Sequence, residues 1–306
     1  MAIDVSRSTS GVALPDEVSG EIWQKLQQGS AVAQLSRSLS LPGNGVTVNV
    51  ITGDPVASVV GETGQKPVSR PSFSNKKIAA HKIAVMVPFS DEFRRDASAL
   101  YSACVDRLPG ALAAKIDSLV FNTDESLANF DFLGGVTAQG IGTKTGKGLA
   151  LAASGIATEG GLLNGWALSP QGQAVLLTAE DGNGRPLFLN SYADGAVPRA
   201  LGAPVIRADS TYKAGTPNQL GFAGDWTKAV FGTVQGVQIS LHTEGSFTDG
   251  TVDVAVSDGT EGATVAVPNI VSLIEHNMFL VRAEVEFGFR VEDADYFRKI
   301  TDATVS

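Results

Sequence analysis

The glycine-rich segment GTKTGKG, residues 142–148, contains the residue types of a phosphate-binding loop. Such a loop needs a glycine five positions before the glycine that precedes its lysine, and a serine or threonine after the lysine, because backbone N–H groups and the hydroxyl together hold the phosphates and Mg²⁺. Ile141 stands at the first of these positions and Gly148 at the second. The pattern therefore argues against a nucleotide site, and we expect residues 129–165, in which glycine is frequent, to form a flexible surface loop.

Histidine and acidic residues form no recognisable catalytic or metal-binding pattern. The three histidines, His81, His242 and His276, are far apart in the sequence, and none has metal-ligand spacing. The sequence contains no GxSxG nucleophile motif. Residues 181–184, DGNG, have the composition of a calcium loop without its correctly spaced terminal Glu, so we expect a turn. We predict that the chain is not an enzyme and uses no catalytic, cofactor-binding or metal-binding residues.

The composition excludes a tight grip on nucleic acid. The chain has 306 residues, of which 23 are basic and 32 acidic, and its net charge of −9 provides no positive footprint for phosphate backbones. The single cysteine, Cys104, allows no internal disulfide, and the sequence shows neither a charged-then-apolar leader nor an apolar span of membrane length. We expect one or two domains of a soluble protein made in a reducing compartment.

Charged side chains suited to protein contacts are concentrated in residues 59–96. In the first half of this stretch, up to Ile78, lysine and arginine are interleaved with glycine and proline, and apolar residues are few. Such a segment can bury almost nothing alone, which predicts an extended arm. From Ile78 to Phe89 the residues alternate and many are β-branched, which predicts a strand that ends near Pro88.

A long helix is expected to follow this strand. Ser90 supplies a hydroxyl cap, and Asp91 and Glu92 place negative charge at the positive end of the helix dipole. Apolar residues then recur at helical spacing along one face: Phe93, Ala97, Leu100, Cys104, Leu108, Leu112, Ile116 and Val120. The other faces are expected to carry the charged residues Arg94, Arg95, Asp96, Asp106, Arg107, Lys115 and Asp117. Because Pro109 removes an amide donor within this run, we predict a kinked helix or two consecutive helices.

Periodicity and turn residues indicate the remaining elements. Near the N-terminus we expect a short helix after Pro15, with Val18, Ile22, Leu26 and Ala31 on one side, and a strand at 46–52. Farther along the chain we expect a helix at 171–179, short strands within 187–208, strands at 229–234 and 237–241 around a turn at 235–236, an exposed hairpin or loop within 245–263, and a long strand at 278–291 with one apolar face.

The order of these features resembles that of the major capsid proteins of tailed bacteriophages, which have the Hong Kong 97 fold. The residues that carry the resemblance are LPDEV at 14–18, VGE at 60–62, PSFS at 71–74, VPFSDE at 87–92, RD at 95–96, LGG at 133–135, GDW at 224–226, FLVRAE at 279–284 and DYF at 295–297. The likeness covers nearly the whole chain, and its weight rests on the shared order.

The resemblance implies an α+β structure with the Hong Kong 97 capsid fold: an amino-terminal arm, an extended β-hairpin loop, a peripheral domain with a long spine helix and a sheet, and an axial domain. On this sequence, the implied parts are the arm and start of the peripheral domain at 1–53, the extended loop at 54–83, the peripheral domain with its spine helix at 84–162, the axial domain at 163–224 and returning strands at 225–306. The spine helix itself would occupy residues 90–122.

The function that the resemblance implies is structural. Copies of the chain would assemble into hexamers and pentamers that form the icosahedral phage head, enclosing double-stranded DNA without sequence-specific binding. The protein would be made in the host bacterial cytoplasm and reside in the virion, with no cofactor and no membrane. Its implied partners are other copies of itself, a separate scaffolding protein if one is used, and portal and decoration proteins. We expect no fused scaffolding segment ahead of the arm.

Expected assembly contacts follow from the same resemblance. Glu62 and the loop lysines Lys66, Lys76 and Lys77 are expected to pair with charges of an adjacent subunit such as Arg94, Arg95 and Asp96, and Pro109 is expected to act as a hinge. Some relatives cross-link a loop lysine to an asparagine, for which Asn269 and Asn277 are candidates here. The surrounding motif does not match, so ordinary salt bridges are favoured. Two alternatives stay open: an encapsulin-like bacterial compartment shell, and a β-rich acidic enzyme or binding protein.

Overall fold

The computed structural model describes residues 26, 29–43, 45–53, 55, 57–60, 64–66, 68–70, 72–96, 98–122, 127–180, 183, 185–188, 197–255 and 264–305. The chain divides into two compact units: unit 1 comprises residues 1–24, 84–112 and 236–285, and unit 2 comprises residues 25–83, 113–235 and 286–306. Within the described part of the chain, no helix has the length and apolar character needed to cross a membrane.

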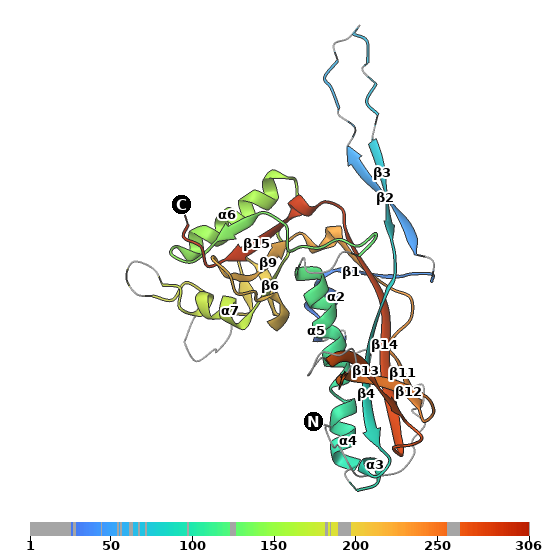
Figure 1. Cartoon of the computed structure of the whole chain (residues 1–306). Helices are drawn as coiled ribbons and strands as arrows, with labels where there is room; N and C mark the ends of the chain where they lie inside the picture. The colour runs from blue at the N-terminus through green and yellow to red at the C-terminus, as the bar shows by residue number, and fades with distance from the viewer. Residues whose placement is uncertain are drawn as a thin grey trace. The chain divides into compact units, whose positions relative to one another are not determined.

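Unit 2 contains a six-stranded sheet with the order β5-β15-β9-β6-β8-β7 (Figure 1). Its strands are β5 (Ala138–Gly140), β6 (Gly165–Leu168), β7 (Arg199–Ala200), β8 (Ala203–Arg207), β9 (Gln219–Gly224) and β15 (Phe297–Thr301). The helices α6 (Thr145–Thr158) and α7 (Pro170–Leu177) contribute to its core, in which Leu149, Ile156, Trp166 and Leu176 are buried. Among the described residues, the connections of unit 2 also contain the short 3-10 helices η2 (Asp209–Thr211), η3 (Trp226–Lys228) and η4 (Ala294–Tyr296).

The long strand β14 (Met278–Val291) belongs to both units and has the bounds that the alternating pattern predicts. Its Phe279, Val281, Ala283, Val285 and Phe287 are buried, which confirms the apolar face. In unit 1 it pairs antiparallel with β11 (Gln238–His242), and in unit 2 with β10 (Ala229–Thr233), which also pairs with β1 (Arg37–Ser40). The strand β4 (His81–Ser90) pairs with β14 as well.

The sequence predicts that the chain reverses direction at a turn at 235–236, and this prediction is wrong. Both β10 and β11 run antiparallel to β14, and their registers follow one another, with Thr233 opposite Phe287 and Gln238 opposite Glu284. The amide of Val234 continues this ladder by donating to the Glu286 carbonyl at 3.2 Å. Residues 235–237 therefore interrupt one long ladder as an irregularity, because both flanking segments find their partner in the same strand.

Two hairpins extend from these sheets. The first joins β2 (Val46–Gly53) to β3 (Ser72–Ile78) in unit 2, and agrees with the extended β-hairpin that the family resemblance implies (Figure 1). The second joins β12 (Ser246–Ala255) to β13 (Thr264–Ser272) in unit 1. The described side chains of this second hairpin are mostly exposed, in agreement with the expected exposed hairpin.

The predicted spine helix consists of α3 (Phe93–Asp96), α4 (Ser98–Val105) and α5 (Leu108–Phe121). Ser90 Oγ accepts from the Phe93 amide at 3.1 Å, as expected of a cap. The helical run breaks at residues 106–107, and Pro109 lies in the first turn of α5, where its missing amide donor has little effect. The prediction of consecutive helices is therefore confirmed, with the break just before the proline.

Two residues of this helical run lie on unexpected faces. Cys104 is exposed, although the helical spacing predicts that it lies on the apolar face. Asp117 is only 1% exposed although it was placed on a charged face. The apolar prediction holds in α5, where Leu112, Ile116 and Val120 are buried. The turn at 106–107 interrupts the helical phase, so a single stripe through both helices could not be correct at every position.

The expectation of a flexible loop over 129–165 is wrong, since this range contains β5 and the 14-residue helix α6. The glycines in α6 mark close packing. A Cβ at Gly148 would lie 2.4 Å from the carbonyl oxygen of Gly140, and one at Gly155 would lie 2.9 Å from Arg298 Nε. Glycine is needed at position 148, because the close atom belongs to the backbone, whereas a side chain at position 155 would require the Arg298 side chain to shift.

Other expected elements have mixed outcomes. Helix α7 follows Ser169, whose side chain accepts from the Gly172 amide, and strands β7 and β8 lie within the range expected for short strands. The short helix expected after Pro15 lies mostly outside the described residues. Its described part includes α2 (Ala31–Leu35), and both Leu26 and Ala31 are buried. The DGNG turn at 181–184 is also outside the described residues, except Asn183.

Candidate assembly surfaces

The base of the β2–β3 hairpin is fixed to β14 by two hydrogen bonds. Lys76 Nζ donates to the carbonyl of Val291 at 2.9 Å, and Arg290 Nε donates to the carbonyl of Lys77 at 3.0 Å. Ile78, which ends β3, is fully buried against Leu41 and Val230. Two of the three loop lysines named from the sequence therefore lie at the anchored end of the hairpin.

Arg290 extends this anchor to the loop that follows α5. Its Nη1 donates to Asp131 Oδ1 at 2.5 Å, and Asp131 Oδ2 accepts from the Val291 amide at 3.0 Å. The Arg290 and Asp131 side chains are 20% and 22% exposed, so this ion pair is better shielded from water than most surface pairs. Arg290 thus connects β3, β14 and the 127–133 loop within unit 2.

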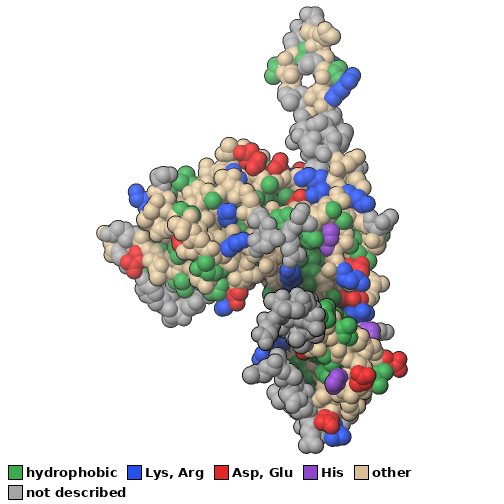
Figure 2. Space-filling view, viewed as in Figure 1, with side chains coloured by type: hydrophobic (Ala, Val, Ile, Leu, Met, Phe, Trp, Pro, Cys, Tyr) green, Lys and Arg blue, Asp and Glu red, His purple; other side chains and the backbone are tan. Residues whose placement is uncertain are grey.

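The segment beyond the hairpin strands has the opposite character. Its described residues between 55 and 70 are exposed, apart from the half-buried Val60. Val59 is 104% exposed and Val68 is 83% exposed, while Lys66 and Arg70 add positive charge (Figure 2). An apolar and cationic surface of this kind is unusual on a chain that functions alone. Glu62 lies outside the described residues.

The start of the spine helix carries an aromatic and cationic cluster in unit 1. Arg94 pairs with Asp91 at 3.1 Å and lies 4.7 Å from the centre of the Phe279 ring. Phe279 stacks on Phe89 and meets the edge of Tyr101. Burial raises the pKa of the Tyr101 hydroxyl, and the positive charge of Arg94 acts in the opposite direction. Arg94 is therefore already engaged within its own chain.

The remaining predicted contact residues are not brought together. Arg95 is exposed, and the side chain of Asp96 is not among those that the structure describes. Of the candidate cross-linking asparagines, Asn269 is half-buried on β13, and Asn277 accepts from the Asp91 amide through its carbonyl at 2.9 Å. Pairing of the loop charges with Arg94, Arg95 and Asp96 of a neighbour stays a prediction.

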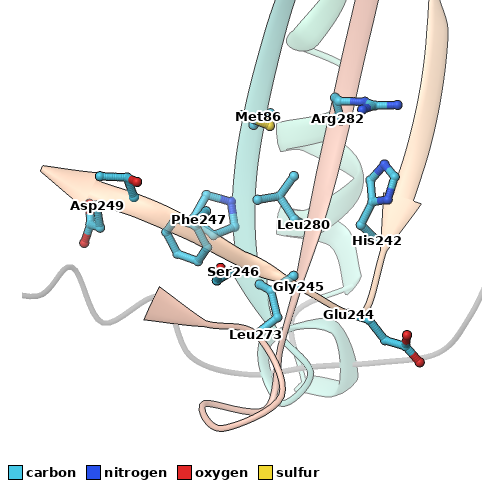
Figure 3. Close-up of a pocket in the computed structure, with 12 residues that line it drawn as sticks. Met86, His242, Glu244, Gly245, Ser246, Phe247, Asp249, Leu273, Leu280 and Arg282 are labelled. Atoms are coloured by element: carbon cyan, nitrogen blue, oxygen red, sulfur yellow. The ribbon is translucent and has the colours of Figure 1, made fainter. Parts of the chain in front are cut away.

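A groove of about 650 Å³ lies in unit 1 beside the β12–β13 hairpin (Figure 3). Met86, Phe247, Leu273 and Leu280 give it an apolar lining, whereas His242, Glu244, Asp249 and Arg282 are its charged or titratable members. Ser240 Oγ lies 2.9 Å from His242 Nε2. Ile270 and Ile274 are 68% and 69% exposed and add apolar surface to the same unit. Apolar areas of this kind are typical of contact surfaces between proteins.

The GTKTGKG segment does not form a phosphate-binding loop. Gly146, Lys147 and Gly148 lie inside α6, and the side chain of Lys144, which precedes the helix, makes no capping hydrogen bond. A cavity of about 440 Å³ lies beside this helix end and includes Glu180 in its lining. Among the side chains that the structure describes, no group of three or more His, Cys, Asp or Glu is placed to hold a metal ion.

One buried site was missed by the sequence analysis. Asp117 Oδ1 accepts from Ser30 Oγ at 2.6 Å, and Asp117 also accepts from the amides of Ala31 and Val32. Burial raises the pKa of Asp117 to about 6, although these hydrogen bonds lower it. The signal in the sequence was weak, because a single aspartate beside Ile116 fits an exposed helix face equally well.

Comparison with known proteins decides the family. The model of the phage capsid family matches residues 10–302. The chain belongs to the phage capsid family. It is 27% identical over 303 residues to "Probable major capsid protein gp17" of Mycobacterium phage D29, a match that covers 94% of this chain and 90% of that protein. The corresponding protein of Mycobacterium phage L5 is 28% identical, with 95% and 90% covered.

Solved structures confirm the fold of this capsid protein. A chain from Microbacterium phage Oxtober96 is 22% identical and has a TM-score of 0.66, covering 89% of this chain and 91% of that one. A chain from Mycobacterium phage Bobi is 16% identical with a TM-score of 0.67, covering 90% and 91%. The expected α+β Hong Kong 97 capsid fold is thus confirmed. The capsid protein is a structural component of the phage head, where it associates with other copies to form the shell.

Proposed function

We propose that this capsid protein forms hexamers and pentamers that close into an icosahedral head around double-stranded DNA. The observation that carries the proposal is the hairpin, whose base is fixed by Lys76 and Arg290 while its distal segment exposes Val59 and Val68. An anchored arm with unburied apolar side chains suits contact with a neighbouring copy. Full burial of each valine would contribute about 1.5–3 kcal/mol.

Charged contacts are proposed to align the arm on its neighbour. Glu62 would meet Arg95, and Lys66 and the side chain of Lys77 would meet Asp96, of the adjacent subunit, whereas Lys76 and Arg94 are engaged within their own chain. Each exposed ion pair contributes only about 0–1 kcal/mol. Many such contacts, added to apolar burial over a large interface, would provide the stability of the shell. The turn before Pro109 is the proposed hinge of the spine helix.

The proposed parts keep the boundaries expected from the sequence, with one exception at residues 138–158. Residues 1–53 would form the arm and the start of the peripheral domain, 54–83 the extended loop, 84–162 the peripheral domain, 163–224 the axial domain and 225–306 the returning strands. The packing of α6 on the β5, β9 and β15 sheet favours grouping residues 138–158 with the axial part instead.

The proposal includes no enzymatic activity, no cofactor and no sequence-specific DNA binding. The net charge of −9 supports enclosure of DNA over tight binding of its backbone. Synthesis in the host cytoplasm, a separate scaffolding protein, and portal and decoration proteins belong to the same proposal. The bacterial compartment alternative lacks comparable support, because the similar curated proteins come from bacteriophages.

Electron microscopy of the purified protein, combined with sedimentation of the same sample, tests the proposal. Closed shells, rings or tubes of capsomer size are expected. A uniform monomer that persists with a crowding agent or a candidate scaffold would overturn it. The charge contacts are tested separately by Glu62→Lys, which should impair shell formation and leave the subunit folded; normal shells from this variant would remove Glu62 from the interface.

A further inference from the structure

The segment that leads into β3 carries two cations and a valine at alternate positions. Residues 66–71 have the sequence KPVSRP, and Lys66, Val68 and Arg70 are all exposed. Lys66 and Arg70 each precede a proline, which disfavours helical backbone and favours an extended conformation. In an extended chain, side chains two residues apart point to the same side. The segment therefore presents a cation, an apolar side chain and a second cation in one row.

The groove beside the β12–β13 hairpin of unit 1 has the complementary arrangement. Figure 3 shows Asp249 and Glu244 on opposite sides of Phe247. Both carboxylates are exposed, and the structure records no ion pair for either of them among the side chains that it describes. Arg282 also lines the groove, but its charge is balanced by Glu284, whose Oε2 lies 3.5 Å from Arg282 Nε. The groove thus offers two unpaired carboxylates with an apolar surface between them.

We propose that this groove binds residues 66–70 of a second copy of the chain, with Val68 on the apolar surface and the two cations beside the two carboxylates. The inference rests on the proposed function, in which the arm contacts a neighbouring copy. It assigns the place of that contact for one part of the arm. For Lys66, a groove carboxylate replaces Asp96 as the partner, and the pairs proposed for Glu62 and Lys77 are unchanged.

The occupant is this part of the arm because both charge and apolar surface match. Val68 is 83% exposed, and Met86 at the groove is 58% exposed, so docking would remove apolar surface from water on both sides. The other exposed valine of the arm, Val59, lacks the flanking charges, since residues 55–61 contain no lysine or arginine. The prolines at 67 and 71 also reduce the conformational entropy that the segment loses on binding.

Exchange of the charges tests the pairing, with shell formation measured by sedimentation over a series of protein concentrations. The groove exchange, Glu244→Lys with Asp249→Lys, should raise the concentration needed for assembly about tenfold, because two attractive pairs become repulsive. The arm exchange, Lys66→Glu with Arg70→Glu, should have a similar effect. A chain with all four substitutions should assemble close to the wild-type concentration. Absence of this recovery would overturn the proposal.

A matched control separates the pairing from net charge. It combines the arm exchange with Glu159→Lys and Glu275→Lys, two exposed carboxylates that do not line the groove. This chain also has the wild-type net charge, but its groove still carries both carboxylates, so assembly should stay impaired. Equal recovery in the control would overturn the proposal. All the exchanged side chains are exposed, so each variant should keep the wild-type subunit stability, which circular dichroism checks.

Chemical cross-linking locates the contact directly. In a Cys104→Ser background, Gln65→Cys on the arm and Thr248→Cys in the groove should be joined between chains by a short bismaleimide, giving covalent oligomers on a denaturing gel. The pair Gln65→Cys and Glu159→Cys should give none. Cross-links within single chains, or shells without cross-links, would overturn this inference and leave the proposed function intact. A wild-type chain that stays monomeric would overturn both.

Discussion

Two regions of unit 2 differ in whether their side chains are buried and hydrogen-bonded within the chain. Around η3, Trp226 is 1% exposed, and Asp225 accepts from the amide of Leu162 and from Asn164 and Thr227. The segment between β2 and β3 instead exposes Val59 almost completely. The buried contacts of the first region contribute to the stability of the subunit. The second region exposes apolar surface that only another molecule could bury. Substitutions in the two regions should therefore separate stability from assembly.

The largest effect on stability is expected from Trp226→Ala. Its ring packs against Phe121 and Phe297, and its indole N–H donates to the Gly165 carbonyl at 3.1 Å. Removal of this buried ring should lower the free energy of unfolding by about 3–5 kcal/mol. Chemical denaturation monitored by circular dichroism measures the change. A loss below about 1 kcal/mol would show that the η3 region contributes much less to folding than its burial indicates.

The sequence predicted those parts of this architecture in which burial follows a regular period. In β14 every second side chain faces the interior, so the alternation at 278–291 gave both its bounds and its buried face. In α5 the spacing of Leu112, Ile116 and Val120 gave the buried stripe for the same reason. One-dimensional patterns succeed where local geometry alone determines which residues face the core.

The missed features depend on contacts between distant segments. The frequent glycines of α6 are typical of a flexible loop when only the sequence is considered. In the structure, Gly148 is required because the Gly140 carbonyl approaches too closely for any Cβ. Asp117 looks like a surface residue until Ser30 and the start of α2 are placed beside it. The assembly contacts are harder still to predict from the sequence, since the proposed partners of Lys66 and Arg95 belong to a second copy of the chain.

An intermediate effect is expected from Arg290→Ala, at the anchored base of the β2–β3 hairpin. The substitution removes the bond to the Lys77 carbonyl and leaves Asp131 without its ion-pair partner. Hydrogen bonds to charged groups contribute about 1.5–3 kcal/mol, so the free energy of unfolding should fall by an amount in that range. Protease cleavage within residues 55–70 should also be faster, because the hairpin base is less firmly held.

A matched control for Arg290→Ala is another arginine of unit 2 that forms a salt bridge. Arg207 pairs with Asp209 at 2.9 Å. The two side chains are 62% and 72% exposed, so Arg207→Ala should change stability by less than about 1 kcal/mol and leave cleavage at 55–70 unchanged. Equal effects of the two substitutions would mean that Arg290 acts through general charge and not through the hairpin anchor.

The smallest effect on folding, and the sharpest test of the contrast, is expected from the double variant Val59→Ser and Val68→Ser. Both side chains are exposed, so their replacement should change the free energy of unfolding by less than about 0.5 kcal/mol. Shell formation should nevertheless decrease, since the arm loses the apolar surface that it would bury against a neighbour.

The control double variant Leu162→Ser and Leu201→Ser removes two other exposed apolar side chains of unit 2 and should leave assembly intact. Denaturation together with sedimentation of assembled particles distinguishes these outcomes. Normal shells from the hairpin variant would assign the association free energy to surfaces outside the arm, whereas loss of shells from both variants would indicate a general need for exposed apolar area.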